Sequence, residues 1–461
     1  MRRHFPIFCA LLGLLLPTLG RAATRTPADT LADTTVVRSW VLANGLRVVT
    51  RQVPKALATA VTVGYSIGTD DDPPGRVGLV QVLGELEFTS ATADFPERTR
   101  EELNSQRPLG WSYPVTRRTT LLSEVAGQGQ LPGVLQQVAS RMRGVQVSKE
   151  GLAAAVKNAQ SEMKAQLYGS GLNPSYYQVR EVAMGHKDDA IASRASGRDL
   201  DKLTVAEAGQ AIQKMFVPAN AVLSLAGDLR GVDVQALTGN LFGSIPAGTR
   251  MAHAKTPVLT PQSRILRLPG IHEPSGVVAV IAPALEDSLH PSFYLNALLF
   301  GSHFNHLWLR EAEGQAPNRW HYAVFDEPDL MRIFPIVGHE TASTDELGSS
   351  VEGALSTFSQ LIVTTEPYEE VRASVLWMLG GPMPPALSSR APRDPSLLTV
   401  MARTMATRAL WGGEKFWSTY RRRFENEKPG HLGDWLAYFK DPKHQVRLLM
   451  LPASAAKPKQ P

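Results

Sequence analysis

The pattern of apolar and polar residues divides most of the chain into strands and helices in a mixed order. The segment "VVRSWVLANGLRVVTRQVP" alternates apolar and polar residues around Asn44-Gly45, a residue pair typical of β-hairpin turns. The next segment, "ATAVTVGYSIGT", predicts another strand, and over residues 77–88 the apolar period becomes helical. The predicted order of elements at the start of the chain is therefore strand, strand, helix.

A helix followed by a buried strand occurs twice, far apart in the chain. The first copy is "LTVAEAGQAIQKMFVPANAVLSLAGDL", whose helix opens on a capping box and stops before Pro218. The second copy, "WLAYFKDPKHQVRLLMLPA", closes the chain. Pro442 and Val446 there stand in the relation of Pro218 and Val222. This internal repetition predicts two halves with the same topology.

The repetition sets the expected domain organisation. We predict an N-terminal domain over residues 36–245, a linker over residues 246–262 that contains proline, glycine and threonine, and a C-terminal domain over residues 263–455. From this internal repetition, rather than from any single motif, we predict the fold class α+β for both halves. The predicted architecture has two homologous α/β-sandwich halves that form a clamshell.

The first residues have the features of a secretory signal peptide. Arg2 and Arg3 precede an apolar run that is too short for a membrane anchor, and small residues follow, so residues 1–22 are predicted to be removed. Cys9 lies inside this segment, so the mature chain cannot form a disulfide. We expect a periplasmic or secreted protein without a membrane span.

Loss of this segment also changes the charge. The full chain has 48 basic and 43 acidic residues, and cleavage after residue 22 removes three arginines and no acids. The remaining excess of two positive charges gives no support for a nucleic-acid partner.

Several segments together are similar to the insulinase/pitrilysin family of zinc peptidases, in the two-domain form related to mitochondrial processing peptidase. They are "LANGLRVVTRQVP", "VTVGYSIGT", the helix start "GLVQVL" and "FVPANAVLSLAGDL". The resemblance implies that the first helix carries an H-x-x-E-H motif. Its two histidines bind zinc, and its glutamate is the general base that acts on the metal-bound water. A glutamate from a later helix supplies the third ligand.

The chain departs from this motif in "GLVQVLGELEFTS". The alignment places Gln81 at the first histidine, Gly84 at the base and Glu85 at the second histidine. Glu162 falls where the resemblance puts the third ligand, and Ala155 replaces an acid that the family often has nearby. The resemblance therefore implies a degenerate member of the family, with one ligand position of three retained.

The chemistry of these residues argues against zinc independently of the alignment. Catalytic zinc requires imidazole or thiolate donors and an open position for water, and no histidine occurs between His4 and His186. An oxygen cluster of Gln81, Glu85 and Glu162 could hold a hard cation weakly. The other reading is that these carboxylates are solvated or paired with basic groups. The sequence predicts no zinc and no other cofactor.

Two further sets of residues lie in the second half. His303 and His306, with Glu311 beyond them, could form a metal site, but no third imidazole completes the set, so surface or capping histidines are expected. The segment "GSHFNHLWLREAEGQ" also resembles a family element whose arginine and a following tyrosine contact the substrate. This resemblance assigns substrate binding to Arg310 and, across an insertion, to Tyr322.

Three functions are compatible with the sequence. The favoured one is an exported homologue without activity of its own, which pairs with an active zinc peptidase subunit of the same family and helps to bind peptides. The second is an active metallopeptidase with unorthodox ligands. The third is a stand-alone peptide-binding or scaffolding protein.

Overall fold

The structure is a computed structural model of the 461-residue chain. It describes residues 37–168, 174–187, 197–252, 258–268, 275–299, 320–321, 330–335, 365–379, 381–382, 384, 390–411, 414–428 and 432–453. The predicted signal peptide lies outside the described residues.

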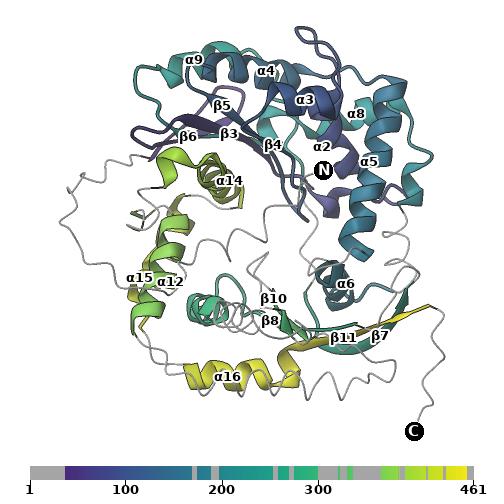
Figure 1. Ribbon diagram of the computed structural model, residues 1–461, viewed down its shortest axis with the longest axis vertical. Helices are drawn as coiled ribbons and strands as arrows, with labels where there is room; N and C mark the ends of the chain where they lie inside the picture. The colour runs from purple at the N-terminus through teal and green to yellow at the C-terminus, as the bar shows by residue number, and fades with distance from the viewer. Residues whose placement is uncertain are drawn as a thin grey trace, which may run out of the picture.

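The first half contains a six-stranded sheet with the order β1-β2-β6-β3-β5-β4 (Figure 1). Strands β2 and β6 are parallel, and every other neighbouring pair is antiparallel. The strands are β1 (Val37–Val41), β2 (Arg47–Gln52), β3 (Ala58–Tyr65), β4 (Trp111–Ser112), β5 (Thr120–Gly127) and β6 (Ala221–Gly227).

The predicted hairpin at Asn44-Gly45 joins β1 to β2. Gly45 has a positive φ of 85°, which glycine adopts without strain. The Asn44 side chain is buried, and its amide nitrogen donates to the carbonyl oxygens of Phe242 (2.8 Å) and Ile245 (2.9 Å). Asn44 therefore ties the hairpin to the last helix of the first half, in addition to its place in the turn.

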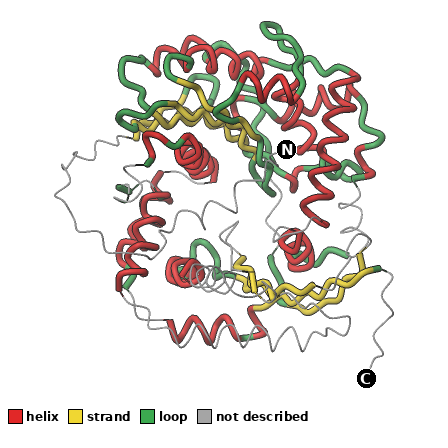
Figure 2. The backbone as a smooth tube through the Cα atoms, viewed as in Figure 1, coloured by secondary structure: helices red, strands yellow, loops and turns green. Residues whose placement is uncertain are grey.

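Helices of the first half cover one face of this sheet (Figures 1 and 2). They are α2 (Leu79–Thr89), α3 (Arg100–Gln106), α4 (Leu131–Arg143), α5 (Lys149–Tyr168), α8 (Val205–Met215) and α9 (Val234–Phe242). Every residue of α2 is buried, because α5, α8 and the sheet pack around it. The first hydrophobic core lies between these helices and the sheet.

The second half repeats this topology in a five-stranded sheet with the order β7-β11-β8-β10-β9. Strands β7 and β11 are parallel, as β2 and β6 are, and the other pairs are antiparallel. The strands are β7 (Gln262–Leu268), β8 (Ser275–Ile281), β9 (Trp320–His321), β10 (Leu330–Pro335) and β11 (Gln445–Pro452). The helices of this half include α12 (Thr365–Met378), α14 (Pro395–Trp411), α15 (Glu414–Asn426) and α16 (Leu432–Lys440), and residues 290–299 are helical as well.

The repeat predicted from the two proline-containing segments is present in the structure. A short 3₁₀ helix, η3 (Pro218–Asn220), leads into β6, and another, η5 (Pro442–His444), leads into β11. Further 3₁₀ turns are η1 (Thr69–Asp71), η2 (Arg198–Leu200) and η4 (Ala391–Arg393). The predicted fold class, α+β with two repeated halves, is confirmed.

Each sheet is covered on its second face by a helix from the other half. Helix α14 packs on β2, β3, β5 and β6, and α6 (Pro174–Ala183) packs on β7, β8 and β11 (Figure 1). Gly64 on β3 permits the close approach of α14, because a Cβ there would lie 3.0 Å from the Ala406 Cβ. The two halves therefore share hydrophobic cores at both contacts.

Arginine side chains add polar contacts between the halves. Arg403 of α14 is buried, and it donates to the hydroxyl oxygens of Ser123 (2.9 Å) and Ser112 on the first sheet. Burial lowers the pKa of Arg403 to about 10, so it remains charged at neutral pH. Arg47 of β2 donates to the Ala409 carbonyl oxygen at 3.0 Å.

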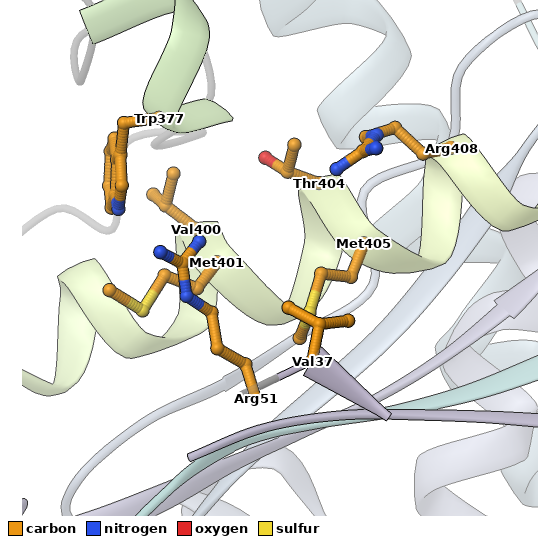
Figure 3. Close-up of a pocket in the computed structure, with 8 residues that line it drawn as sticks. All are labelled: Val37, Arg51, Trp377, Val400, Met401, Thr404, Met405 and Arg408. Carbon is orange, nitrogen blue, oxygen red and sulfur yellow. The ribbon is translucent and has the colours of Figure 1, made fainter. Parts of the chain in front are cut away.

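A small pocket lies at this junction of β1, β2, α12 and α14 (Figure 3). Arg51 reaches from β2 across the junction and donates to the Gly381 carbonyl oxygen at 3.1 Å. The residues that line the pocket are Val37, Arg51, Trp377, Val400, Met401, Thr404, Met405 and Arg408. Because apolar side chains of both halves form most of this lining, the pocket belongs to the contact that joins them.

Candidate functional site

The candidate site is built on α2, which the loop after β3 positions. The carboxylate of Asp72 accepts hydrogen bonds from the backbone nitrogens of Gly78 (2.7 Å) and Val80 (2.9 Å). A carboxylate at this end also interacts favourably with the helix dipole. Gly78, at the N-cap, has a φ of 91°, a conformation that side chains rarely adopt. These contacts fix where α2 begins.

Two polar pairs meet where α2 packs on α5. Gln81 and Glu85 are four residues apart on α2, and Asn158 and Glu162 are four residues apart on α5, so each pair lies on one helix face. The Gln81 amide nitrogen donates to the Glu162 carboxylate at 2.6 Å, and the Asn158 amide nitrogen donates to the Glu85 carboxylate at 2.9 Å. The structure therefore brings together the three predicted positions that carry polar side chains.

Arg100, the first residue of α3, connects the two carboxylates. Its guanidinium forms a two-pronged ion pair with Glu85, with the Nε atom 2.7 Å from a carboxylate oxygen, and it reaches Glu162 at 2.8 Å. Burial alone would lower the pKa of Arg100, but its interactions with Glu85, Tyr113 and Glu162 raise that pKa above its usual value overall. Arg100 is therefore a permanent positive charge between two acids.

Tyr113 completes the network above Gly84. Its hydroxyl donates to the Glu85 carboxylate and lies close to Glu162, while its ring covers the α2 backbone. Burial, followed by the charges of Glu162 and Glu85, raises the pKa of Tyr113 well above its usual value, so the hydroxyl stays protonated. A Cβ at position 84 would lie 2.8 Å from a ring carbon of Tyr113. The ring thus occupies the space that any side chain at position 84 would need.

This contact predicts that Gly84→Ala destabilises the protein. Glycine to alanine inside a helix normally adds about 0.5–1 kcal/mol of stability. At position 84 the new methyl group would displace the tethered Tyr113 ring, and we expect a net loss of about 1–3 kcal/mol. Urea denaturation measures the change in the free energy of unfolding.

The control for this prediction is Gly209→Ala. Gly209 lies inside α8, and an added Cβ there would meet no atom within 4 Å. It should stabilise the protein, so equal effects of the two substitutions would contradict the role assigned to Tyr113.

The side chains of this site do not fit the zinc ion that the insulinase resemblance implies. Gln81 offers an amide, Gly84 has no side chain, and both carboxylates are bound to Arg100. Within the described ranges, no three His, Cys, Asp or Glu side chains form a group that could hold a metal ion. Of the two readings of Glu85 and Glu162, pairing with a basic group describes this structure. Gly84 has no side chain that could act as the general base on a metal-bound water.

Residues that sequence reasoning missed supply most of the network. Arg100, Tyr113 and Asn158 lie far from the motif in sequence, and the only local signal was the spacing of Asn158 and Glu162 on one helix face. The predicted substrate residues Arg310 and Tyr322, and the histidine pair with Glu311, lie outside the described residues.

Among the described helices, none combines the length and apolar character needed to cross a bilayer.

Comparison with solved structures identifies the fold. A protease from Helicobacter pylori superposes with a TM-score of 0.70 at 14% identity, covering 91% of this chain and 100% of that one. A peptidase M16 inactive domain from Pseudomonas fluorescens gives a TM-score of 0.66 at 13% identity, covering 92% of this chain and 99% of that one. No family model and no curated protein matches the sequence.

A third match relates the chain to a longer protein. The first half of the periplasmic protease PqqL from Escherichia coli gives a TM-score of 0.62 at 14% identity, covering 91% of this chain and 92% of that one. In the structure of PqqL with both halves, the match covers 47% of that chain. The chain therefore has the fold of M16 peptidases, the insulinase/pitrilysin type, and corresponds in length to one half of PqqL.

Proposed function

We propose that this chain is a catalytically inactive homologue of insulinase-like zinc peptidases. It is exported, it pairs with an active zinc peptidase of the same fold, and it contributes binding surface for peptides. The observation that carries this proposal is the network on α2 and α5. There the guanidinium of Arg100 neutralises Glu85 and Glu162, and Tyr113 covers Gly84.

The comparisons support this proposal in two ways. One similar structure is an M16 domain described as inactive, so the fold exists in a form without catalysis. The chain also spans about half of PqqL, and the first half of that protein alone has this fold. A second chain of the same fold could supply here what the other half supplies in a longer protein.

The edge of the first sheet supports a role in peptide binding. Strand β4 ends the described sheet, and an extended peptide can add to such an edge through backbone hydrogen bonds. At this edge Trp111 is partly exposed, and its ring stacks on the buried ring of Tyr113 with their centroids 6.1 Å apart. The exposed part of the Trp111 ring beside this strand edge offers contact area for peptide side chains. Arg310 and Tyr322 are proposed to contact the same peptide.

The proposal is tested by co-expression with a homologue that carries an intact H-x-x-E-H motif, the best candidate being one encoded by a neighbouring gene. We expect a stable complex that cleaves a quenched fluorescent peptide faster than the active subunit alone. Arg310→Ala should raise the KM for the peptide and leave assembly intact, and Arg310→Lys should recover part of the loss. Absence of any association would refute the pairing.

Measurements on the isolated chain distinguish the two alternative functions from the proposed one. Stoichiometric zinc in the purified protein, with chelator-sensitive cleavage, would show an active peptidase with unorthodox ligands. Peptide binding by the isolated chain, with no complex formed, would instead identify a stand-alone binding protein.

A further inference from the structure

The ion pairs of Arg100 have a role that the loss of catalysis alone does not explain. A degenerate metal site needs no replacement for its metal, because its carboxylates can turn toward water. Glu85 cannot do this, because its side chain is 2% exposed and every residue of α2 around it is buried. A carboxylate in that position requires a neutralising charge within contact distance.

The guanidinium of Arg100 supplies that charge in a way that joins several elements. Arg100 stands at the start of α3, Glu85 is on α2 and Glu162 is on α5, so one cation connects three helices. Tyr113, which directly follows β4, accepts a hydrogen bond from Arg100 and donates one to Glu85. A planar guanidinium with five donors can serve all these acceptors at once, which a single ammonium group cannot.

We propose that Arg100 is the built-in cation of this site, holding α2, α3, α5 and β4 together in the way that a bound metal holds its ligands. The carboxylates of Glu85 and Glu162, which also accept hydrogen bonds from the amide nitrogens of Asn158 and Gln81, place a cage of hard oxygen atoms around this positive charge. In the natural protein that charge is covalently part of the chain. The cage is therefore closed to metal ions while Arg100 is present.

The proposal predicts that a variant without the Arg100 guanidinium binds a free metal cation at the same place. Arg100→Ala leaves Glu85 buried without its charged partner, and we expect the melting temperature to fall by about 5–10 °C in the presence of a chelator. Addition of millimolar Ca²⁺ or Mn²⁺ should restore at least half of that loss, because hard cations prefer oxygen ligands. The melting temperature of the unaltered protein should not respond to either ion.

Two further variants test the proposal even if Arg100→Ala does not fold. Arg100→Gln retains hydrogen-bond donors without the charge, so it should fold even if Arg100→Ala does not, and it should respond to the same cations. The double variant Arg100→Gln with Glu162→Gln removes one carboxylate from the cage, and its response to Ca²⁺ and Mn²⁺ should disappear.

A matched control is Arg76→Ala. Arg76 is also an arginine beside α2, but it pairs with Glu207, which is 44% exposed and can be solvated when the pair is lost. This variant should melt within about 2 °C of the unaltered protein and should not respond to cations.

For every variant, isothermal titration measures the binding of Ca²⁺ and Mn²⁺, and thermal unfolding measures the melting temperature with and without these ions. Cation-dependent stability of Arg100→Ala or Arg100→Gln, absent in the unaltered protein, supports the proposal. Equal cation responses in all the variants, or none in either Arg100 variant, would overturn it. Neither measurement involves a peptide or a partner subunit, so the outcome is independent of the proposed pairing.

Discussion

Raising the pH from 5 to 9 is expected to destabilise this protein through Glu87, and Glu87→Gln should remove that part of the pH dependence. Glu87 lies on α2 with 1% of its surface exposed, and neither of its carboxylate oxygens has a hydrogen-bond partner. Burial raises its pKa from 4.5 to about 8, partly offset by the charge of Arg141. The buried side chain is therefore a neutral acid at neutral pH.

The direction in which stability changes with pH follows from the raised pKa of Glu87 in the folded state. A carboxyl group with a raised pKa in the folded state stabilises the fold fully below pH 4.5, and this contribution is lost as the pH rises through 8. The rise from 4.5 to about 8 corresponds to at most about 5 kcal/mol. Relative to the unaltered protein, Glu87→Gln should gain stability from pH 5 to about pH 8, and the gain should level off above that pH.

Urea denaturation at pH 5, 7 and 9 measures this difference directly. The control is Glu207→Gln, because Glu207 is exposed and hydrogen bonds with Arg76 lower its pKa to about 2. Its carboxylate stays ionised over the whole interval, so this variant should track the unaltered protein. If the curve of Glu87→Gln also runs parallel to that of the unaltered protein, the Glu87 carboxyl is not a buried neutral acid.

Trp377→Ala is expected to cost about 3–5 kcal/mol and to uncouple the unfolding of the two halves. Trp377 belongs to α12, is 2% exposed, and packs in the core that α14 shares with the first sheet (Figure 3). Its loss leaves a cavity in the contact that joins the halves, whereas the main core of each half stays intact. A single cooperative transition should then separate into two.

Calorimetry and tryptophan fluorescence, recorded on the same samples, detect this separation. Trp435→Ala is the matched control, because Trp435 is a similarly buried tryptophan within the core of the second half. It should lower the stability of that half and leave the transition of the first half in place. Coincident transitions in Trp377→Ala, with a loss below about 1 kcal/mol, would contradict a shared core that couples the halves.

Much of the fold follows from local patterns that the sequence contains. The alternation around Asn44-Gly45 and the helical period of α2 and α5 were sufficient to place these elements, because side-chain direction repeats with the backbone. The repeated proline before a buried strand, at Pro218 and Pro442, identified the two halves, and the structure has the same strand order in both. The absence of histidine near α2 can be read directly from the sequence, without the coordinates.

The candidate site was only partly predictable. The alignment found Gln81, Glu85 and Glu162, which lie together as expected. It did not find Arg100 or Tyr113, since their contacts with α2 arise from the packing of α3 and β4. Polar residues in a helical pattern are normally assigned to the solvent side, so Glu87 gave no sign of its burial.

What the sequence determined by itself was therefore the order of elements, the repetition of the halves and the absence of imidazole ligands at α2. All three depend on residues close together in the chain. Only the tertiary structure decided which charge meets Glu85 and Glu162, and that α6 and α14 each pack on the sheet of the other half. The physical reason is that charge neutralisation and the burial of a sheet face act through space, between residues whose separation along the chain carries no signal.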